Sequence, residues 1–189
     1  MTDYLSGYIS IIDIKNRGKI LGRIKFAADQ KFFSTINLPI QNLVSQPIVD
    51  KEEGLYFATH AGVLEKYSLK TQKLIWTIDI PGISNISYVG NTIFVTTIAK
   101  QVIAVNALDG QIAWITDIRT DPKKVPVFLP IMVINNSVVA LSNTGHITVI
   151  NPENGMIISH LEIGRPIVSA VVLNQALHVF TEHGVMIFE

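Results

Sequence analysis

Histidine is the residue type in this chain best suited to hold a metal ion or to exchange protons near neutral pH. No two of the histidines have the spacing that places two metal ligands on one turn of a helix. Those at positions 60 and 183 lie next to predicted hairpin turns. The sequence therefore favours solvated histidines in turns and assigns no metal ligand. The five histidines are His60, His146, His160, His178 and His183.

The carboxylates are the next candidates for chemistry. Asp109 and Glu153 lie in predicted glycine turns, where a carboxylate accepts hydrogen bonds from backbone N–H groups. No two carboxylates have a spacing that argues for acid–base catalysis. We therefore assign no catalytic residue. Four further aspartates flank predicted strands: Asp13, Asp50, Asp79 and Asp117.

Composition excludes several classes of function. The chain contains no cysteine, which rules out disulfides, thiolate metal sites and a cysteine nucleophile. It also lacks a glycine-rich phosphate loop and a Gly-x-Ser-x-Gly elbow. Lys plus Arg number 15, as do Asp plus Glu, and no basic stripe is interleaved with aromatics. Nucleic acid is therefore not an expected partner.

Targeting and membrane signals are also missing from the sequence as it stands. The start, Met1 to Tyr4, has neither the basic residues nor the apolar core of a signal peptide. No apolar run reaches the ~18 residues of a membrane span. We expect no signal peptide, no lipidated cysteine and no transmembrane segment.

Repeated hairpins are the strongest structural signal. Residues 55–67, 92–105, 137–149 and 176–188 each contain two short stretches with apolar side chains at period two, joined by a turn. Gly62, Gly145 and Gly184 occupy the turn in three copies, where a positive φ is easily adopted. Lys100 stands there in the fourth copy. That turn must either have another geometry or carry strain.

A second motif follows most hairpins. In residues 69–76, 108–114 and 152–159, a polar turn leads into an outer strand, and residues 16–22 are a weaker version. Gly110 and Gly155 hold two of these turns. Trp76 and Trp114 close two of the outer strands and are interpreted as packing onto the sheet rather than as a stacking surface for a quinone or a sugar.

Strand-opening prolines complete the pattern, in residues 45–49, 128–133 and 164–168. Short strands with a period near 40 residues predict a β-propeller of four-stranded antiparallel blades. We expect one all-β domain over residues 1–189: a half blade (4–26), a connection (27–44), blades at 45–80, 82–118 and 125–163, and a partial blade at 164–189. About four blades are present, and because the chain starts in the middle of a blade we favour half of an eight-bladed ring over the alternative, a closed four-bladed ring.

Together, the hairpins, glycine turns and tryptophans resemble the PQQ-like (quinoprotein-type) repeat family. The order of irregular blades is similar to the C-terminal half of its members that assist outer-membrane barrel assembly. This resemblance implies a non-catalytic protein-binding scaffold on the periplasmic side of the outer membrane, with the barrel-assembly machinery as partner and no cofactor. An alternative is a fragment or subunit of a PQQ-dependent oxidoreductase. Those enzymes add a cysteine pair and calcium-binding carboxylates, and this chain has no cysteine.

The partner-binding residues are expected in the connections between blades, because a rigid propeller presents its loops to partners. Apolar residues in a long connection need a surface to cover, which favours residues 27–46 over the loop from Arg119 to Lys124. In the family an acidic pair before the blade-opening proline contacts the partner, and Asn42 and Val44 replace it here. Self-association, or pairing with a missing propeller half, is a further expectation. The predicted partner-binding residues are Phe32, Phe33, Leu38, Asn42, Leu43 and Val44.

Overall fold

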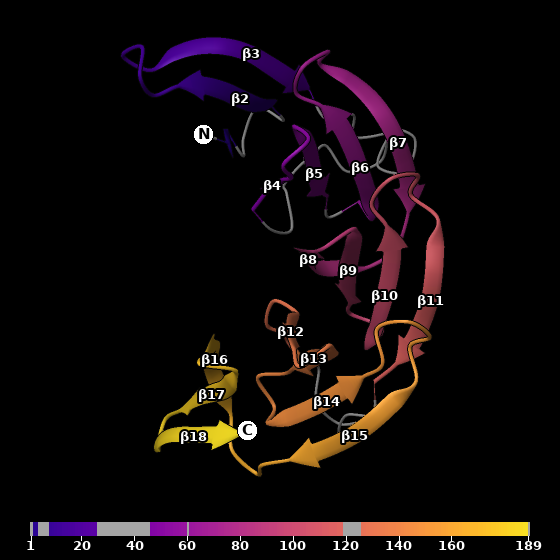
Figure 1. The fold of residues 1–189 in the computed structure, drawn as a ribbon, viewed down its shortest axis with the longest axis vertical. Helices are drawn as coiled ribbons and strands as arrows, with labels where there is room; N and C mark the ends of the chain where they lie inside the picture. Colours follow the sequence, from indigo (N-terminus) through magenta and orange to yellow (C-terminus); the bar gives the residue numbers. More distant parts are fainter. Residues whose placement is uncertain (1, 4–7, 26–45, 60, 119–125, 189) are drawn as a thin grey trace, which may run out of the picture. The chain divides into compact units, whose positions relative to one another are not determined.

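The computed structural model describes residues 2–3, 8–25, 46–59, 61–118 and 126–188. It divides into two compact units, residues 1–81 and 82–189. All regular structure in the described residues consists of antiparallel β-strands (Figure 1). Among them there is no helix long and apolar enough to cross a membrane.

The first unit holds two sheets. Strands β1 (Thr2–Asp3), β2 (Tyr8–Asp13) and β3 (Lys19–Lys25) form the first sheet in chain order. Strands β4 (Ile48–Val49), β5 (Gly54–Ala58), β6 (Val63–Ser68) and β7 (Lys73–Asp79) form the second. Their apolar faces meet in one cluster, in which Ile9 and Ile24 of the first sheet pack with Leu55 and Phe57 of the second.

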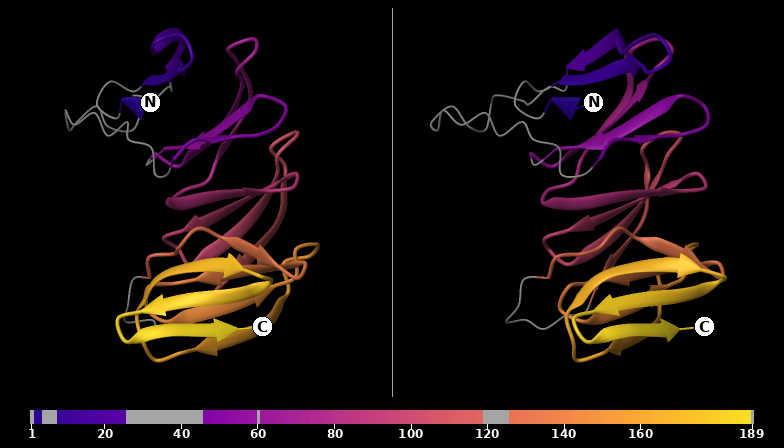
Figure 2. Two further views of the ribbon diagram at one scale, coloured as in Figure 1. Left: turned by 60° about the vertical axis from the view of Figure 1, so that its left-hand side comes forward. Right: turned by 90° about the vertical axis from the view of Figure 1, so that its left-hand side faces the viewer.

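The second unit holds three sheets, again with consecutive strands paired. The first contains β8 (Ile83–Val89), β9 (Thr92–Thr97), β10 (Gln101–Asn106) and β11 (Ile112–Asp117). The second contains β12 (Met132–Ile134), β13 (Ser137–Leu141), β14 (His146–Ile150) and β15 (Ile157–Glu162). The last has three strands, β16 (Ile167–Leu173), β17 (Ala176–Thr181) and β18 (Gly184–Phe188). Figure 2 shows these three sheets stacked in chain order.

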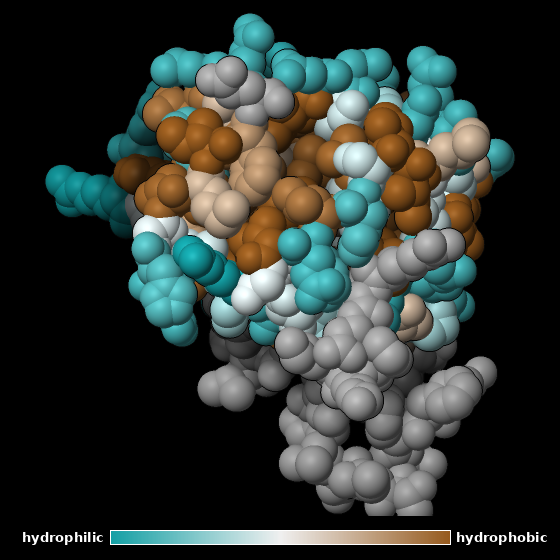
Figure 3. Space-filling view, turned by 90° about the horizontal axis from the view of Figure 1, so that it is seen from below, coloured by the Kyte–Doolittle hydropathy of each residue, from teal (hydrophilic) through white to brown (hydrophobic). Residues whose placement is uncertain are grey.

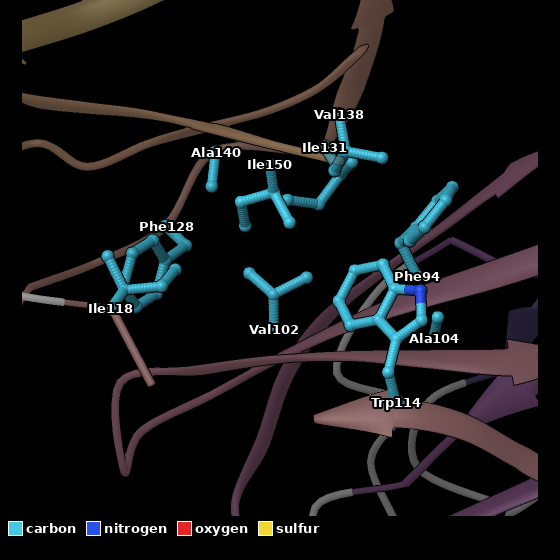
Figure 4. Packing of buried hydrophobic residues seen from close by; sticks show 10 residues of the cluster. All are labelled: Phe94, Val102, Ala104, Trp114, Ile118, Phe128, Ile131, Val138, Ala140 and Ile150. Atoms are coloured by element: carbon cyan, nitrogen blue, oxygen red, sulfur yellow. The ribbon is translucent and has the colours of Figure 1, made fainter. Parts of the chain in front are cut away.

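Within this unit, the face of a sheet toward the following sheet is called its forward face, and the face toward the preceding sheet is called its back face. Phe94, Val102 and Trp114 form part of the forward face of sheet β8–β11. They pack against Val138 and Ile150 on the back face of sheet β12–β15 (Figure 4). The period-two alternation of a strand puts successive side chains on opposite faces, so the middle sheet is apolar on both.

The other face of the middle sheet makes the next layer. Val139, Leu141 and Ile147 are on its forward face and pack with Leu177 and Val179 of the last sheet. Both interfaces are built from aliphatic side chains with occasional aromatics. Burial of this apolar area, worth roughly 25 cal/mol per Å², holds successive sheets together.

A β-bulge marks the start of each outer strand. The pairing register shifts between Ile11 and Ile12, between Lys66 and Tyr67, between Ala104 and Val105, and between Val149 and Ile150. A bulge increases the local twist of a sheet. Its recurrence at equivalent positions shows that β2–β3 follows the same plan as β6–β7, β10–β11 and β14–β15.

The turn between the two central strands is also repeated. The amide of Gly62 donates to the carbonyl oxygen of Thr59 at 2.9 Å, and the carbonyl oxygen of Gly62 accepts from Ile80. Lys100 makes the equivalent pair of bonds, donating to Thr97 and accepting from Ile118. Its φ is 66°, in the left-handed region, like the 85° of Gly62. Lys100 therefore keeps the turn geometry and carries the strain, which decides between the two alternatives left by the sequence.

Candidate interaction surface

The predicted partner-binding residues lie outside the part of the chain that the structure describes. This holds for Phe32, Phe33, Leu38, Asn42, Leu43 and Val44, and for the loop from Arg119 to Lys124. Their assignment therefore stays a prediction. The described residues on either side show how the two connections are anchored, and they contain three polar clusters that chemistry could use.

The first polar cluster anchors the turn after β4, directly beyond the 27–46 connection. One carboxylate oxygen of Asp50 accepts from the amides of Glu52 at 2.8 Å and Gly54 at 2.7 Å. The other accepts from the Tyr56 hydroxyl at 2.7 Å, and the Lys66 ammonium lies 5.1 Å from the centre of the Tyr56 ring.

Electrostatics agree with a structural role for this cluster. Partial burial on its own would raise the pKa of Asp50. The hydrogen bonds from Tyr56, Gly54 and Glu52, with the nearby positive charge of Lys66, outweigh that effect and lower the pKa. Asp50 thus remains ionised and fixes the turn that receives the connection.

The second cluster is a buried carboxyl group. Glu65 lies on β6 and faces Phe57 and Thr77 on its neighbouring strands. It is only 5% exposed, and its Oε2 has no hydrogen-bond partner among the described residues. Burial raises the pKa of Glu65 to about 7. Burial, and then the charge of Glu65, also raise the pKa of Tyr67. A single buried carboxyl group of this kind makes the stability of the protein depend on pH, and by itself it does not indicate a catalytic site.

The third cluster contains two histidines on neighbouring strands. The rings of His146 and His160 are stacked, with centroids 5.3 Å apart, and Nδ1 of His160 lies 2.9 Å from the Thr148 hydroxyl. His146 is buried, so the expectation of a solvated turn position is wrong for this residue. His183 does lie exposed in a turn. Nowhere in the described ranges do three or more His, Asp or Glu side chains converge to hold a metal ion.

The tryptophans have packing roles. The Trp114 ring lies 5.9 Å from Phe94, and its indole N–H donates to the carbonyl oxygen of Pro152 at 2.8 Å. A Cβ on Gly155, whose φ is 73°, would lie 2.8 Å from the Trp114 ring. The turn that follows β14 is therefore seated directly on this ring. Trp76 lies 6.1 Å from Tyr56 and is only partly buried.

The other predicted repeat glycines differ in position. Gly110 and Gly145 have positive φ values of 76° and 91° in their turns. Gly184 begins β18, where it pairs with Thr181, and Glu182 and His183 form a shorter turn. The last hairpin thus reverses in one residue fewer than the others.

Comparison with known proteins identifies the repeat. A family model described as outer membrane protein assembly factor BamB matches residues 6–184. An uncharacterised protein of Rickettsia conorii is 30% identical over 139 residues, which cover 71% of this chain and 33% of that protein. A second one, from Rickettsia prowazekii, is 25% identical over the same length. The chain thus spans a third of the length of these relatives.

Solved structures establish the fold. The crystal structure of BamB from Moraxella catarrhalis matches 96% of this chain and 51% of its own, with a TM-score of 0.72 and 16% identity. The dihydro-heme d1 dehydrogenase NirN matches 98% of this chain and 40% of its own, with a TM-score of 0.73 and 14% identity. At such identities the likeness concerns the fold alone. It confirms the predicted all-β, partial propeller of four-stranded antiparallel blades.

Proposed function

We propose that this chain, which belongs to the BamB family of PQQ-like repeat proteins, is a non-catalytic protein-binding scaffold that assists the assembly of outer-membrane β-barrel proteins. The observation that carries the proposal is the family match, which extends over residues 6–184 and so includes nearly every blade. The proposed site of action is the periplasmic side of the outer membrane.

The geometry of the described residues supports a scaffold. Stacked sheets with aliphatic interfaces are rigid, and a rigid scaffold positions its loops for a partner. The polar cluster around Asp50 and the hydrogen bond from the Trp114 indole to Pro152 fasten turns to the sheets. The proposed partner segment, residues 27–46, leads directly into the turn that Asp50 fixes.

An oxidoreductase is the competing proposal, since the structural neighbour NirN is a dehydrogenase. PQQ enzymes hold calcium, which prefers six to eight oxygen ligands supplied largely by carboxylates. The carboxylates of the described residues do not gather into such a group. Because these carboxylates do not form a calcium site, we derive no reaction through the ion or its cofactor and favour the scaffold.

A pull-down tests the proposal. The purified chain is used as bait in a detergent-solubilised bacterial envelope extract, and bound proteins are identified by mass spectrometry. We expect recovery of barrel-assembly proteins, lost when residues 27–46 are replaced by a Gly/Ser segment of equal length. The matched control replaces residues 119–125 in the same way and retains binding. Unchanged thermal unfolding of both variants excludes a loss of fold.

The opposite result is equally specific. The scaffold proposal is wrong if no barrel-assembly protein is recovered and a calorimetric titration shows stoichiometric binding of PQQ with calcium. That result would indicate an oxidoreductase subunit instead.

A further inference from the structure

Successive sheets of this chain pack through faces of similar chemistry. The cluster between β1–β3 and β4–β7 and the two clusters within residues 82–189 consist mainly of Ile, Leu and Val with a few aromatic side chains. Further apolar side chains are exposed on the surface, as one face of the molecule shows (Figure 3). The hydrophobic effect is non-directional, so it does not by itself determine which sheet follows which. Because repeated units are prone to misassembly, a more specific contact between sheets is expected.

One position of the outer strand varies widely in size between sheets. In sheets β1–β3, β4–β7, β8–β11 and β12–β15, this residue pairs with the last residue before the β-bulge of the neighbouring strand. The four positions are therefore structurally equivalent, although their side chains range from that of glycine to that of tryptophan. The four pairs are Gly22 with Ile11, Trp76 with Lys66, Trp114 with Ala104, and Ser159 with Val149.

The turn that precedes each of these outer strands has an equivalent position four residues earlier. Gly155 has a φ of 73°, and its amide donates to the carbonyl oxygen of Asn151 at 2.9 Å. Gln72 has a φ of 56°, and its amide donates to the carbonyl oxygen of Ser68 at 2.8 Å. A left-handed conformation is unfavourable for a residue with a Cβ, so the Gln72 side chain is expected to make a compensating contact. The four turn residues are Gly18, Gln72, Gly110 and Gly155.

In the first unit, the side chain of Gln72 contacts the outer strand of the preceding sheet. A Cβ on Gly22 of β3 would lie 2.5 Å from Nε2 and 2.9 Å from Cδ of Gln72, which belongs to the turn between β6 and β7. The side-chain amide of Gln72 therefore occupies the space that a side chain at position 22 would need. This one contact accounts for both departures of the pair from the repeat, glycine in place of tryptophan at position 22 and glutamine in place of glycine at position 72.

In the second unit, the same two positions have the opposite sizes. Trp114 on β11 is the large residue, and its indole N–H donates to the carbonyl oxygen of Pro152 in the turn between β14 and β15. Gly155 in that turn is the small residue, since a Cβ there would lie 2.8 Å from the Trp114 ring and 2.7 Å from the Thr116 hydroxyl oxygen. A glutamine at position 155 does not fit over this ring.

We propose that these two pairs determine the order of the sheets, because the turn of one sheet seats on the outer strand of another only where a side chain meets a glycine. Gly22 of β1–β3 accepts a turn that carries a side chain, and Trp114 of β8–β11 accepts only a glycine turn. In the wrong order, Gln72 would collide with a tryptophan, or glycine would meet glycine and the contact would be lost. A clash of this kind against the wrong partner is a source of specificity. The inference does not depend on the scaffold function, because it concerns contacts within the chain.

A double-mutant cycle in the second unit tests the pair, with urea denaturation of the full chain as the measurement. Gly155→Gln should raise the equilibrium constant for unfolding at least about tenfold more than the matched control Gly90→Gln. Both glycines have a positive φ, 73° and 61°, but a Cβ on Gly90 would have no heavy atom within 4 Å beyond its chain neighbours. Trp114→Gly should be less damaging in the Gly155→Gln background than in the wild-type background. Equal effects at positions 155 and 90, or additive effects of Trp114→Gly and Gly155→Gln, overturn the proposal.

A second cycle, in the first unit, decides the question if Gly155→Gln leaves no folded protein. Gly22→Trp alone should raise the equilibrium constant for unfolding at least about tenfold. Adding Gln72→Gly should recover most of that loss, because the two changes together reproduce the arrangement of Trp114 with Gly155. Gly22→Trp with Gln72→Glu is the matched control, since glutamate has the size of glutamine, and it should recover nothing. No recovery with Gln72→Gly, or equal recovery with both changes, overturns the proposal.

Discussion

Sheets β4–β7 and β8–β11 follow one plan but fill equivalent positions differently. In the first, Phe57 pairs with Glu65 and Trp76 pairs with Lys66. In the second, the equivalent pairs are Val95 with Ile103 and Trp114 with Ala104. The turn residue changes as well, from Gly62 to Lys100.

The comparison shows that the repeat fixes the backbone more strongly than it fixes the side chains. Sheet β8–β11 is apolar at both central pairs and places its strain in a turn. Sheet β4–β7 has a relaxed turn but carries a buried acid and a buried lysine. Burying a charge is costly unless it is paired, so β4–β7 is expected to respond to pH and β8–β11 to respond mainly to packing.

The largest expected difference concerns the two tryptophans. Trp114→Ala removes a buried ring and its hydrogen bond to Pro152, and should lower the free energy of unfolding by about 3–5 kcal/mol. Trp76→Ala removes a ring that is only partly buried and should lower the free energy of unfolding by roughly half as much. Urea denaturation of both variants measures the difference. Equal losses would mean that the contact with the turn at Pro152 contributes little.

The next effect is a pH dependence caused by Glu65. Its pKa is raised from 4.5 to about 7 in the folded protein, so the unfolded state loses this proton first as pH rises. Stability from this group is therefore complete below pH 4.5 and is lost between pH 4.5 and 7, by about 3 kcal/mol.

Glu65→Gln isolates that contribution. The variant cannot titrate, so the difference in unfolding free energy between variant and wild type should grow in favour of the variant from pH 4.5 to 7 and then level off. Denaturation at a series of pH values provides the curve. A constant difference across the range would show that Glu65 does not titrate in this way.

The smallest expected effects concern the two equivalent hairpin turns, which contain Lys100 in one sheet and Gly62 in the other. Lys100→Gly should stabilise the protein by roughly 0.5–1 kcal/mol. Glycine removes the strain of a left-handed backbone conformation at this position, and that gain exceeds the extra conformational entropy that glycine loses on folding. Gly62→Ala should have the opposite sign, by at least about 1–2 kcal/mol, since its Cβ would lie 2.9 Å from the carbonyl oxygen of Ile80. Thermal unfolding compares them, and changes of the same sign would contradict a shared turn geometry.

The sequence was informative where the repeat is regular. Period-two alternation and Gly62 and Gly145 predicted the hairpins, and the position of Trp114 predicted its packing. Alternation could not reveal which polar residues are buried, because the spacing of a polar residue along a strand is the same whether its face is covered or exposed. Glu65 and His146 therefore looked like ordinary polar positions. The sequence also left open whether the turn at Lys100 has another geometry or carries strain. The answer depends on the hydrogen bonds that hold the turn, which the sequence does not show.

Photo-crosslinking tests directly whether residues 27–46 contact a barrel-assembly protein. The chain has no cysteine, so a photoreactive group can be attached to Phe33→Cys in the proposed partner segment, with Ile115→Cys as the matched control. After illumination in a solubilised envelope, we expect a cross-link from position 33, but not from position 115, to a protein of the outer-membrane barrel-assembly machinery. No such product, or equal products from both positions, would contradict this contact.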